Sequence, residues 1–251
     1  MTIFGVYKRY PFAIPFRAKF FNVFRFVFRL SVLERFLISR IERSKWKFWN
    51  KLIPPLYFYS PGSIRRVVRD SIAFRLDLSK LLDHSIYFFT VKDIGWHNLF
   101  QLLRPNFRII DIGANIGYLT LQFANRCPKG MVYAFEPDSE TFHNLCQNVR
   151  LNDVDHIRLF HTALGATTGS AKLYRLYEAN PGANRILSHP PSDPVRSETV
   201  QITTLDEYKN NGCFDGVDLI KIDVEGFELF VLQGAREVIV QWKPLLFVEL
   251  I

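Results

Sequence analysis

The chain has 251 residues, of which 48% are hydrophobic, 15% aromatic and 22% charged, and its formal net charge is +8. This length allows one large domain, or one domain with an extension, and the apolar content excludes a disordered chain. Residues 1–70 hold 15 Lys and Arg against three acids, whereas residues 71–251 hold 17 against 21. We therefore expect a basic, Phe-rich extension over residues 1–70 and the main domain over residues 71–251.

The cysteine count and the hydropathy pattern indicate the compartment. Three cysteines without a CxxC pair argue against a disulfide framework and against a Cys-based zinc site. No stretch reaches the ~18 uninterrupted apolar residues that a membrane-spanning helix needs. Cations interrupt every apolar run near the start, which is not typical of a secretory signal. The expected location is cytoplasmic.

The extension interleaves aromatic and cationic residues between Phe16 and Trp49. Arg25 and Arg29 lie one helical turn apart and an apolar stripe follows them, so we predict a basic amphipathic helix. Such a helix can make peripheral contact with an anionic membrane. The equal alternative is that its Phe side chains dock on the main domain while its cations face water. Nucleic acid is not an expected partner, because no nucleic-acid-binding motif accompanies the charge. The predicted stripe consists of Val32, Phe36 and Leu37.

Strand and helix patterns alternate after Ser85, and a Pro-rich joint at residues 52–62 precedes them. This alternation predicts an α/β fold, in which a parallel sheet carries helices on both faces. A long irregular insertion at residues 172–203, with Asn180 and Asn184, is typical of a binding loop. The predicted strands are 107–111, 131–135, 157–161, 217–223 and 245–250, and the predicted helices are 116–126, 139–148 and 227–242.

The turn after the first of these strands carries a glycine motif from Asp111 to Gly117. Gly113 permits a tight turn, and Gly117 lets the following helix approach the strand. A dinucleotide-binding loop has glycine at its middle position, so that a pyrophosphate can approach the backbone. Here Asn115 occupies that position, and Asp111 adds negative charge. The motif therefore favours a cationic cofactor without phosphate, such as S-adenosylmethionine, and it is not a P-loop.

Glu136 ends the second predicted strand, where a carboxylate accepts both hydroxyls of an adenosine ribose. This role is common to NAD and S-adenosylmethionine sites. Pro137 and Asp138 then turn the chain, and Asp138 or Ser139 is expected to cap the next helix. Two acids in register with the glycines indicate a cofactor site.

The fourth predicted strand carries Lys221, Asp223 and Glu225 at alternate positions, so they share one face. A central parallel strand is normally apolar on both faces, so these charges are expected at the ligand edge or in a buried network. Asp223 is our first candidate for a general base or substrate-orienting group, and Lys221 would hold it in position. The alternative is a purely structural pair. His161, at the end of the third strand, is a minor candidate base.

Five motifs in order resemble those of the FkbM-type methyltransferases, over roughly Phe107 to Leu250. They are Asp111-x-Gly-Ala-Asn-x-Gly-Tyr118, Phe135-Glu-Pro-Asp138, Asn148-Val-Arg-Leu-Asn152, Thr204-Leu-Asp206 and Lys221-Ile-Asp-Val-Glu-Gly-Phe-Glu228. The resemblance implies a Rossmann-like class I methyltransferase fold and S-adenosylmethionine-dependent methylation of a hydroxyl on a small molecule, secondary metabolite or sugar. It also implies a variable substrate-side segment at the insertion. By the same resemblance, the cofactor-binding residues are Asp111, Gly113, Ala114, Asn115, Gly117, Glu136 and Pro137.

The C-terminal end departs from the family pattern. The sequence stops at Ile251, directly after the fifth predicted strand, whereas this fold usually adds an antiparallel hairpin. We therefore expect a sheet without that hairpin, whose edge strand favours pairing with another chain, as in a homodimer.

Two other functions stay open. An NAD-dependent oxidoreductase would share Glu136, and a non-catalytic protein that binds a membrane or a partner could keep a degenerate cofactor site. The acids of the fourth strand could also hold Mg²⁺, but no ligand set is complete, so we assign no metal site.

Overall fold

The computed structural model describes residues 16–43, 48–89, 94–187, 189–192 and 195–249. The chain divides into two compact units. One unit combines the residues up to Val67 with Leu76–Val91, and the other combines Val68–Arg75 with the residues from Lys92 onward.

The expected domain boundary at residue 70 falls in the turn of a hairpin. Strands β1 (Ile64–Arg69) and β2 (Ile72–Asp77) form a two-stranded sheet, and Asp70 and Ser71 between them have positive φ. The two units share this hairpin, because its tip is grouped with the C-terminal unit.

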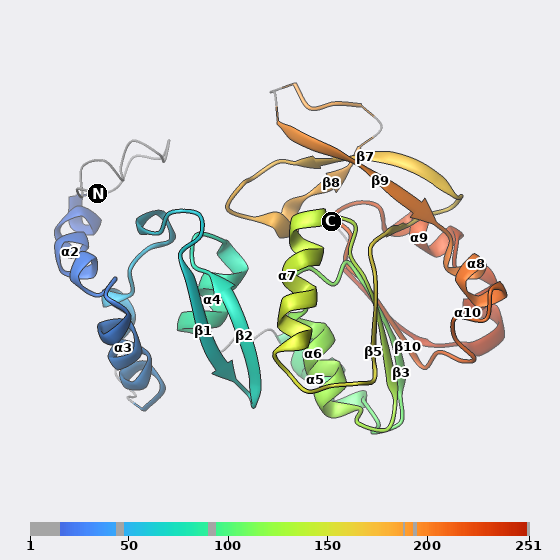
Figure 1. The fold of residues 1–251 in the computed structure, drawn as a ribbon, viewed down its shortest axis with the longest axis horizontal. Coiled ribbons are helices and arrows are strands. Elements are labelled where there is room, and N and C mark those ends of the chain that lie inside the picture. The colour runs from blue at the N-terminus through green and yellow to red at the C-terminus, as the bar shows by residue number, and fades with distance from the viewer. Residues whose placement is uncertain (1–15, 44–47, 90–93, 188, 193–194, 250–251) are drawn as a thin grey trace. The chain divides into compact units, whose positions relative to one another are not determined.

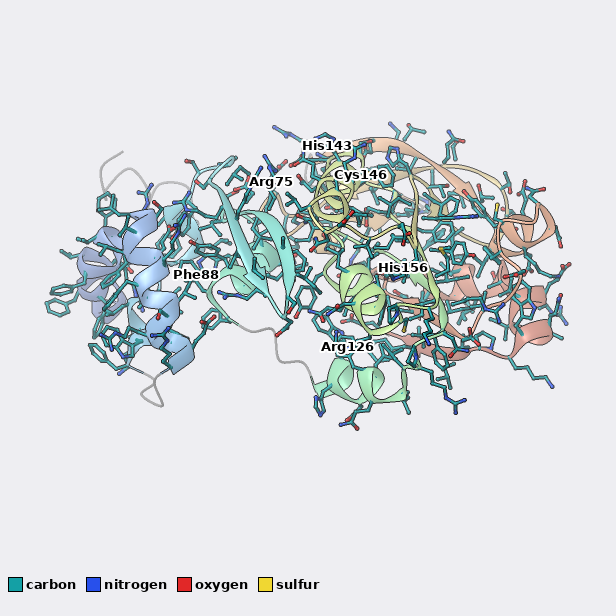
Figure 2. All side chains as sticks on the ribbon, turned by 60° about the horizontal axis from the view of Figure 1, so that its bottom comes forward. Arg75, Phe88, Arg126, His143, Cys146 and His156 are labelled. Carbon is teal, nitrogen blue, oxygen red and sulfur yellow. The ribbon has the colours of Figure 1, made fainter. Side chains whose placement is uncertain are left out.

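The N-terminal unit is mainly helical (Figure 1). Two helices replace the single helix that the pattern predicts, because bonds from Arg29 N to Phe26 O and from Leu30 N to Val27 O close the first helix. The Pro-rich joint is also more than a linker, since it contributes buried Phe58 and Tyr59 to the core. The elements are α2 (Phe16–Val27), α3 (Ser31–Arg43), η1 (Trp49–Leu52), η2 (Leu56–Phe58) and α4 (Leu81–Phe88), which ends at the Phe88 labelled in Figure 2.

A buried carboxylate ties these elements together. Glu34 of α3 is fully buried and pairs with Arg65 Nε of β1 at 2.6 Å. Its two oxygens also accept hydrogen bonds from the hydroxyls of Tyr59, at 2.9 Å, and Tyr87, at 3.3 Å. Burial and the nearby Glu34 carboxylate raise the pKa of Tyr87 to about 12, so its hydroxyl stays protonated and donates.

The C-terminal unit is built on a five-stranded sheet of order β11-β10-β3-β4-β5, in which every neighbouring pair is parallel. This confirms the predicted α/β fold, and each strand lies within two residues of its expected range. The chain runs outward from β3 to β5 and then returns to the other side of β3 as β10, so the strand order reverses between β3 and β10. The strands are β3 (Arg108–Ile112), β4 (Met131–Phe135), β5 (Ile157–Phe160), β10 (Leu219–Ile222) and β11 (Leu245–Val248).

Helices cover both faces of this sheet (Figure 1). The predicted helix over residues 227–242 is interrupted at Gly234 and Ala235, and Gly234 packs so closely that a Cβ there would lie 1.9 Å from the carbonyl oxygen of Gly165. The helices are α5 (Ile94–Leu102), α6 (Tyr118–Arg126), α7 (Ser139–Arg150), α8 (Leu205–Asn210), α9 (Glu228–Gln233) and α10 (Arg236–Trp242).

Side chains on alternate positions of the strands pack on the two faces. Ile110, Phe135 and Ile220 join the apolar core with Val231 of α9 and Val238 of α10. Positions of the opposite parity face α7, where Ala134 packs with Leu145. Asp111 pairs in register with Ala134 and with Lys221, so these two charged residues lie on the α7 face.

The insertion at residues 172–203 is more regular than the sequence predicts. It contributes most of a second sheet of order β6-β9-β7-β8, with β7 antiparallel to β9 and β8. Most of this sheet's side chains are exposed or half-buried, so its hydrophobic pattern is weak; Leu173, Val200 and Ile202 form its small core with Ala163. Figure 1 shows the sheet across one end of the central sheet. The strands are β6 (Ala163–Leu164), β7 (Gly169–Arg175), β8 (Arg185–Ile186) and β9 (Arg196–Thr203).

The last strand, β11, lies at an edge of the central sheet. In the described part of the chain it pairs with β10 alone, and Leu245 and Leu246 are exposed. Pairing of this edge with a second chain stays a prediction. None of the helices that the structure describes has the length and the hydropathy to span a bilayer.

Replacing Glu34 with alanine tests the buried network of the N-terminal unit. Glu34→Ala leaves Arg65 and two tyrosine hydroxyls without their acceptor, so we expect a loss of about 3 to 5 kcal/mol in the free energy of unfolding. Chemical denaturation measures it. The control is Glu42→Ala, at an exposed position of the same helix, with an expected change of about 0.5 kcal/mol or less. Equal losses of unfolding free energy for the two substitutions would contradict the claim that Glu34 stabilises the N-terminal unit.

Candidate active site

Asp111 and Lys221 meet at the point where the strand order of the central sheet reverses. They are partners in the register of β3 and β10, and Lys221 Nζ lies 3.2 Å from Asp111 Oδ1. The other oxygen of Asp111 accepts a 2.6 Å hydrogen bond from Thr120 of α6. Ligands of open parallel sheets bind beside this reversal, at the carboxyl ends of the strands. Asp111 itself is fully buried, so Lys221 and Thr120 hold its carboxylate.

The ammonium of Lys221 also holds the turn after β3. It donates to the carbonyl oxygens of Gly113, at 2.7 Å, and Ile112, at 3.2 Å, and lies 3.6 Å from Asp223 Oδ2. Burial alone would lower the pKa of Lys221, but Asp111 and Asp223 outweigh burial and raise it. The side chain therefore stays charged and connects β10, the turn and Asp223.

Two glycines permit the close contacts around this turn. Gly113 has φ +75°, and a Cβ there would lie 1.9 Å from the carbonyl oxygen of Asp223. Gly117 has φ +87°, and a Cβ there would lie 2.6 Å from Leu145 Cδ1. The sequence predicts that Gly117 serves the approach of a helix to the strand, but the contact is with α7. A side chain at Gly113 would push the turn away from the backbone of Asp223, whereas one at Gly117 would displace the Leu145 side chain and strain the left-handed backbone.

The backbone amides of the glycine loop are all satisfied by the protein itself. Asn115 has a left-handed backbone, with φ +52°, and its amide donates to Glu136. A loop that binds a diphosphate points such amides at the ligand. Here no amide from residue 113 to residue 117 is left for that purpose. The acceptors are Phe135 O for Gly113 N and Ala114 N, Glu136 Oε2 for Asn115 N, Asn115 Oδ1 for Ile116 N, and Ala114 O for Gly117 N.

Glu136 follows β4 and is buried at the same edge of the sheet. One carboxylate oxygen accepts from Asn115 N at 2.8 Å, and the other accepts from Asp138 N at 2.9 Å, with the half-buried Pro137 between the two acids. Burial raises the pKa of Glu136 to about 7, although these amides and Lys221 pull it down. The two amides fix the carboxylate in place, and each oxygen keeps a lone pair for a ligand hydroxyl.

Asp138 anchors the second sheet to the edge of the central one. As predicted, its Oδ1 caps α7 by accepting from Thr141 N at 2.9 Å. Its Oδ2 accepts from Arg175 Nε of β7 at 2.7 Å and from Asn184 Nδ2 at 3.1 Å. Arg175 also reaches Glu198 of β9, at 3.4 Å.

The segment from Asn180 to Arg185, which we call the roof, lies against three loops of this edge. A Cβ at Gly182 in the roof would lie 3.1 Å from Asn115 Nδ2, in the loop after β3. Asn184 bonds Asp138, after β4, and Arg185 Nη2 bonds Glu225, after β10, at 3.3 Å. Two buried polar atoms of the roof, Asn184 Oδ1 and Arg185 Nε, have no partner in the protein. Such atoms are normally satisfied, so the roof retains hydrogen-bonding capacity.

Two acids follow β10, and their surroundings differ. Asp223 follows the strand directly and has a partly exposed side chain beside Lys221. Glu225 does not continue the row that the alternation predicts, because the strand ends at Ile222 and Glu225 has φ +57°. Burial and the charge of Asp223 raise the pKa of Glu225, while Arg185 opposes the shift. A partly exposed acid therefore lies next to a buried cation at the edge where a ligand is expected.

His161 lies apart from this group. Its exposed ring stacks on Phe142 of α7, with centroids 4.7 Å apart. It follows β5, which is three strand positions from β10, or roughly 14 Å at the usual spacing. The histidines do not cluster either, since His143 and His156 lie apart in Figure 2. Among the residues that the structure describes, no group of three or more His, Cys, Asp or Glu side chains could hold a metal ion.

The third and fourth motifs make structural hydrogen bonds within the C-terminal unit. Asn148 and Asn152 of the third motif bond the backbone of Arg75 and Ala73 in β2, and Asn148 also donates to Ile116 O. In the fourth motif, Asp206 accepts from the first amides of α10. These residues position the loops without forming part of the site.

Sequence reasoning missed Arg175, which joins β7 of the second sheet to Asp138, and Arg185, which joins the roof to Glu225. Both lie in the insertion that the sequence predicts to be irregular. The one available signal was the polar and apolar alternation from Thr199 to Thr203, which is typical of a strand with one buried face.

Comparison with known proteins finds methyltransferases among the relatives of this chain. Methyltransferase 1 of Beauveria bassiana is 29% identical over 145 residues, which cover 50% of this chain and 57% of that protein. Methyltransferase sdnD of Sordaria araneosa is 28% identical over 196 residues, with coverages of 62% and 75%. The 2-O-methyltransferase NoeI of Sinorhizobium fredii is 26% identical over 154 residues, with coverages of 57% and 63%. The chain thus matches between about half and three quarters of these relatives' lengths.

A solved structure and a family of domains also match. The methyltransferase FkbM of Methylobacillus flagellatus aligns with a TM-score of 0.43 and 18% identity, over 88% of this chain and 49% of that one. The methyltransferase FkbM domain matches residues 111–251, which is more than half of the chain. The chain therefore belongs to the FkbM methyltransferase family, whose cofactor is S-adenosylmethionine.

Proposed function

We propose that this protein is an S-adenosylmethionine-dependent O-methyltransferase that acts on a hydroxyl of a small molecule or sugar. The observation that carries the proposal is the glycine loop, whose amides all have acceptors within the protein, beside an edge that carries Glu136, Asp223 and Glu225. The carboxylates suit a cation, and the glycine loop has no amide left for a diphosphate. The similarity to a 2-O-methyltransferase supports a hydroxyl acceptor.

The residues at this edge fit the cofactor. When bound, S-adenosylmethionine supplies an activated methyl group on a positively charged sulfur. Glu136 has two fixed oxygens, and we assign it to the two ribose hydroxyls. The partly exposed Asp223 provides negative charge for the cationic end, while Lys221 already neutralises Asp111. An NAD site would need glycine at the loop position that Asn115 occupies.

Asp223 is our candidate for the group that receives the proton of the acceptor hydroxyl. Its carboxylate is partly exposed, whereas Asp111 is buried. Lys221 Nζ lies 3.6 Å from Asp223 Oδ2 and helps to hold this carboxylate in position, as a base requires. Beyond this base, methyl transfer requires mainly that the hydroxyl lie in line with the reactive methyl group. We assign that alignment to the roof, whose unpartnered polar atoms can bind the acceptor. We propose no role for His161.

Calorimetry with S-adenosylhomocysteine and NADH tests the cofactor assignment. We expect the protein to bind S-adenosylhomocysteine and to bind NADH at least a hundredfold more weakly. Tight binding of NADH with no binding of S-adenosylhomocysteine would contradict the proposal.

The pH dependence of cofactor binding tests Glu136. Only the carboxylate form accepts from both ribose hydroxyls, and the pKa of Glu136 is raised to about 7. The affinity for S-adenosylhomocysteine should therefore be constant above about pH 7 and fall below it, by up to about tenfold per pH unit. Glu136→Gln should weaken binding and remove this dependence. As the control, Glu237→Gln on α10 should leave the profile unchanged. A flat profile in the unaltered protein would count against the ribose assignment.

Asparagine at position 223 tests the proposed base. Asp223→Asn keeps the size of the side chain but cannot take up the proton, so kcat should fall about a hundredfold or more. The affinity for S-adenosylhomocysteine should change little by comparison. The assay follows labelled methyl transfer to a panel of sugars and hydroxylated small molecules. Asp215→Asn, at a side chain 91% exposed, is the control. Undiminished transfer by Asp223→Asn would remove this residue from the mechanism.

Removing the charge of Arg175 tests the attachment of the roof. Arg175→Met deprives Asp138 of its cation, so the roof should loosen and its backbone amides should exchange hydrogen faster. We also expect the dissociation constant of S-adenosylhomocysteine to rise about tenfold. Arg196→Met is a matched control, because its ion pair with Glu178 lies on the same sheet but is exposed. The idea fails if both substitutions have the same effect on exchange.

A further inference from the structure

The outer face of α2 is apolar, although the helix is docked by its other side. Asn22 is fully buried and donates to Tyr57 Oη at 2.8 Å, and Phe26 packs edge-on against Phe58 with centroids 5.9 Å apart. The opposite face carries exposed side chains at positions i, i+3, i+4 and i+7, which form one stripe along a helix. They are Phe20, Val23, Phe24 and Val27, with exposed fractions of 60, 57, 51 and 53%.

This stripe bears on the alternative that the sequence left open, because Phe26 packs on the protein whereas Phe20 and Phe24 do not. If the Phe residues docked on the protein and the cations alone faced water, Phe20 and Phe24 would be buried. They are exposed instead, and their rings contact each other at 5.7 Å. The connection to α3 extends the apolar surface with Leu30 and Val32, which are exposed too. Contiguous apolar surface of this kind marks an interaction site.

The exposed face of α3 adds positive charge to this surface. Arg35, Arg40 and Arg43 are exposed there, together with Phe36. Of the two acids of this helix, Glu34 is buried against Arg65 and Glu42 is exposed, so arginines outnumber acids at its surface. Figures 1 and 2 both show α2 and α3 next to each other, and Figure 2 shows side chains extending outward from them.

We propose that α2 and α3 form a docking surface for an anionic lipid bilayer. The apolar stripe enters the boundary between headgroups and acyl chains, and the arginines lie among the anionic headgroups. Charge argues against a second copy as the occupant, because a symmetric dimer on this face would bring like charges together. A nucleic acid would match the charge but leave the apolar stripe in water.

Sedimentation with vesicles tests this surface in the full chain. We expect the chain to sediment with vesicles of phosphatidylcholine and phosphatidylglycerol in equal parts, less so at high salt, and not with phosphatidylcholine alone. Phe20→Ser combined with Phe24→Ser should lower the partition coefficient at least tenfold. Arg35→Gln combined with Arg43→Gln should lower it about twentyfold. Leu229→Ser combined with Val240→Ser removes equally exposed apolar side chains of α9 and α10, and should change nothing.

Several outcomes would overturn the proposal. One is absence of sedimentation with the anionic vesicles, and another is sedimentation that neither pair of substitutions weakens. A dimer in solution that Phe20→Ser and Phe24→Ser dissociate would assign the face to a second copy. Retention of an RNA homopolymer without vesicle binding would assign it to nucleic acid. Circular dichroism and S-adenosylhomocysteine binding confirm that each variant is folded, and both are expected to match the unaltered chain.

Discussion

The contact between Lys221 and Asp111 is the constraint on which the site depends. Both side chains are buried, and a buried charge without its partner costs several kcal/mol, so each requires the other. Their place in register on β10 and β3 joins the two strands at the point where the strand order reverses. The same ammonium binds the carbonyl oxygens of Ile112 and Gly113, and thereby draws the turn against Asp223. Only glycine fits there. The geometry of the cofactor loop thus follows from one ion pair and one missing side chain.

The way this loop is folded determines its preference for charge. In dinucleotide-binding proteins of related topology, loop amides and the helix N-terminus face a pyrophosphate. Here the amides turn toward Phe135 and Glu136, and the freely available groups at the edge are carboxylates. A carboxylate at the position of Glu136 is common to NAD and S-adenosylmethionine sites, so the ribose role that we propose for it does not discriminate between the cofactors. The argument for discrimination is the loop itself, because the amide of Asn115 donates to Glu136 and is not left for a ligand.

Local patterns predict the central sheet and the ends of its strands, because short β-branched runs and glycines act over a few residues. They also identify Asp111, Glu136 and Lys221, since charge in or next to a buried strand is unusual. They do not predict the second sheet, whose pattern is weak because most of its side chains are exposed or half-buried. Gly234 packs against the distant Gly165, and the bond from Arg175 to Asp138 spans 37 residues. Contacts at such separations leave no signal in the spacing of residues. The motif at Asn148 and Asn152 was recognised as part of a family pattern, but its role in holding β2 is visible only in the structure.

The distribution of charge follows from the burial of acids. In the C-terminal unit several acids gather at the edge of the sheet, where Lys221 pairs with Asp111, Arg175 with Asp138 and Arg185 with Glu225. In the N-terminal unit the arrangement is reversed: Glu34 is drawn inside to satisfy Arg65 and two tyrosines, which removes a negative charge from the surface of α3. At the surface of that helix three arginines therefore stand against one acid, Glu42, which leaves the helix surface positively charged. A net charge of +8 thus arises from two surfaces of opposite character, an acidic edge suited to a cationic cofactor and a basic, apolar face suited to anionic lipid. Because each surface depends on the interior of its own unit, substitutions on one should leave the other intact.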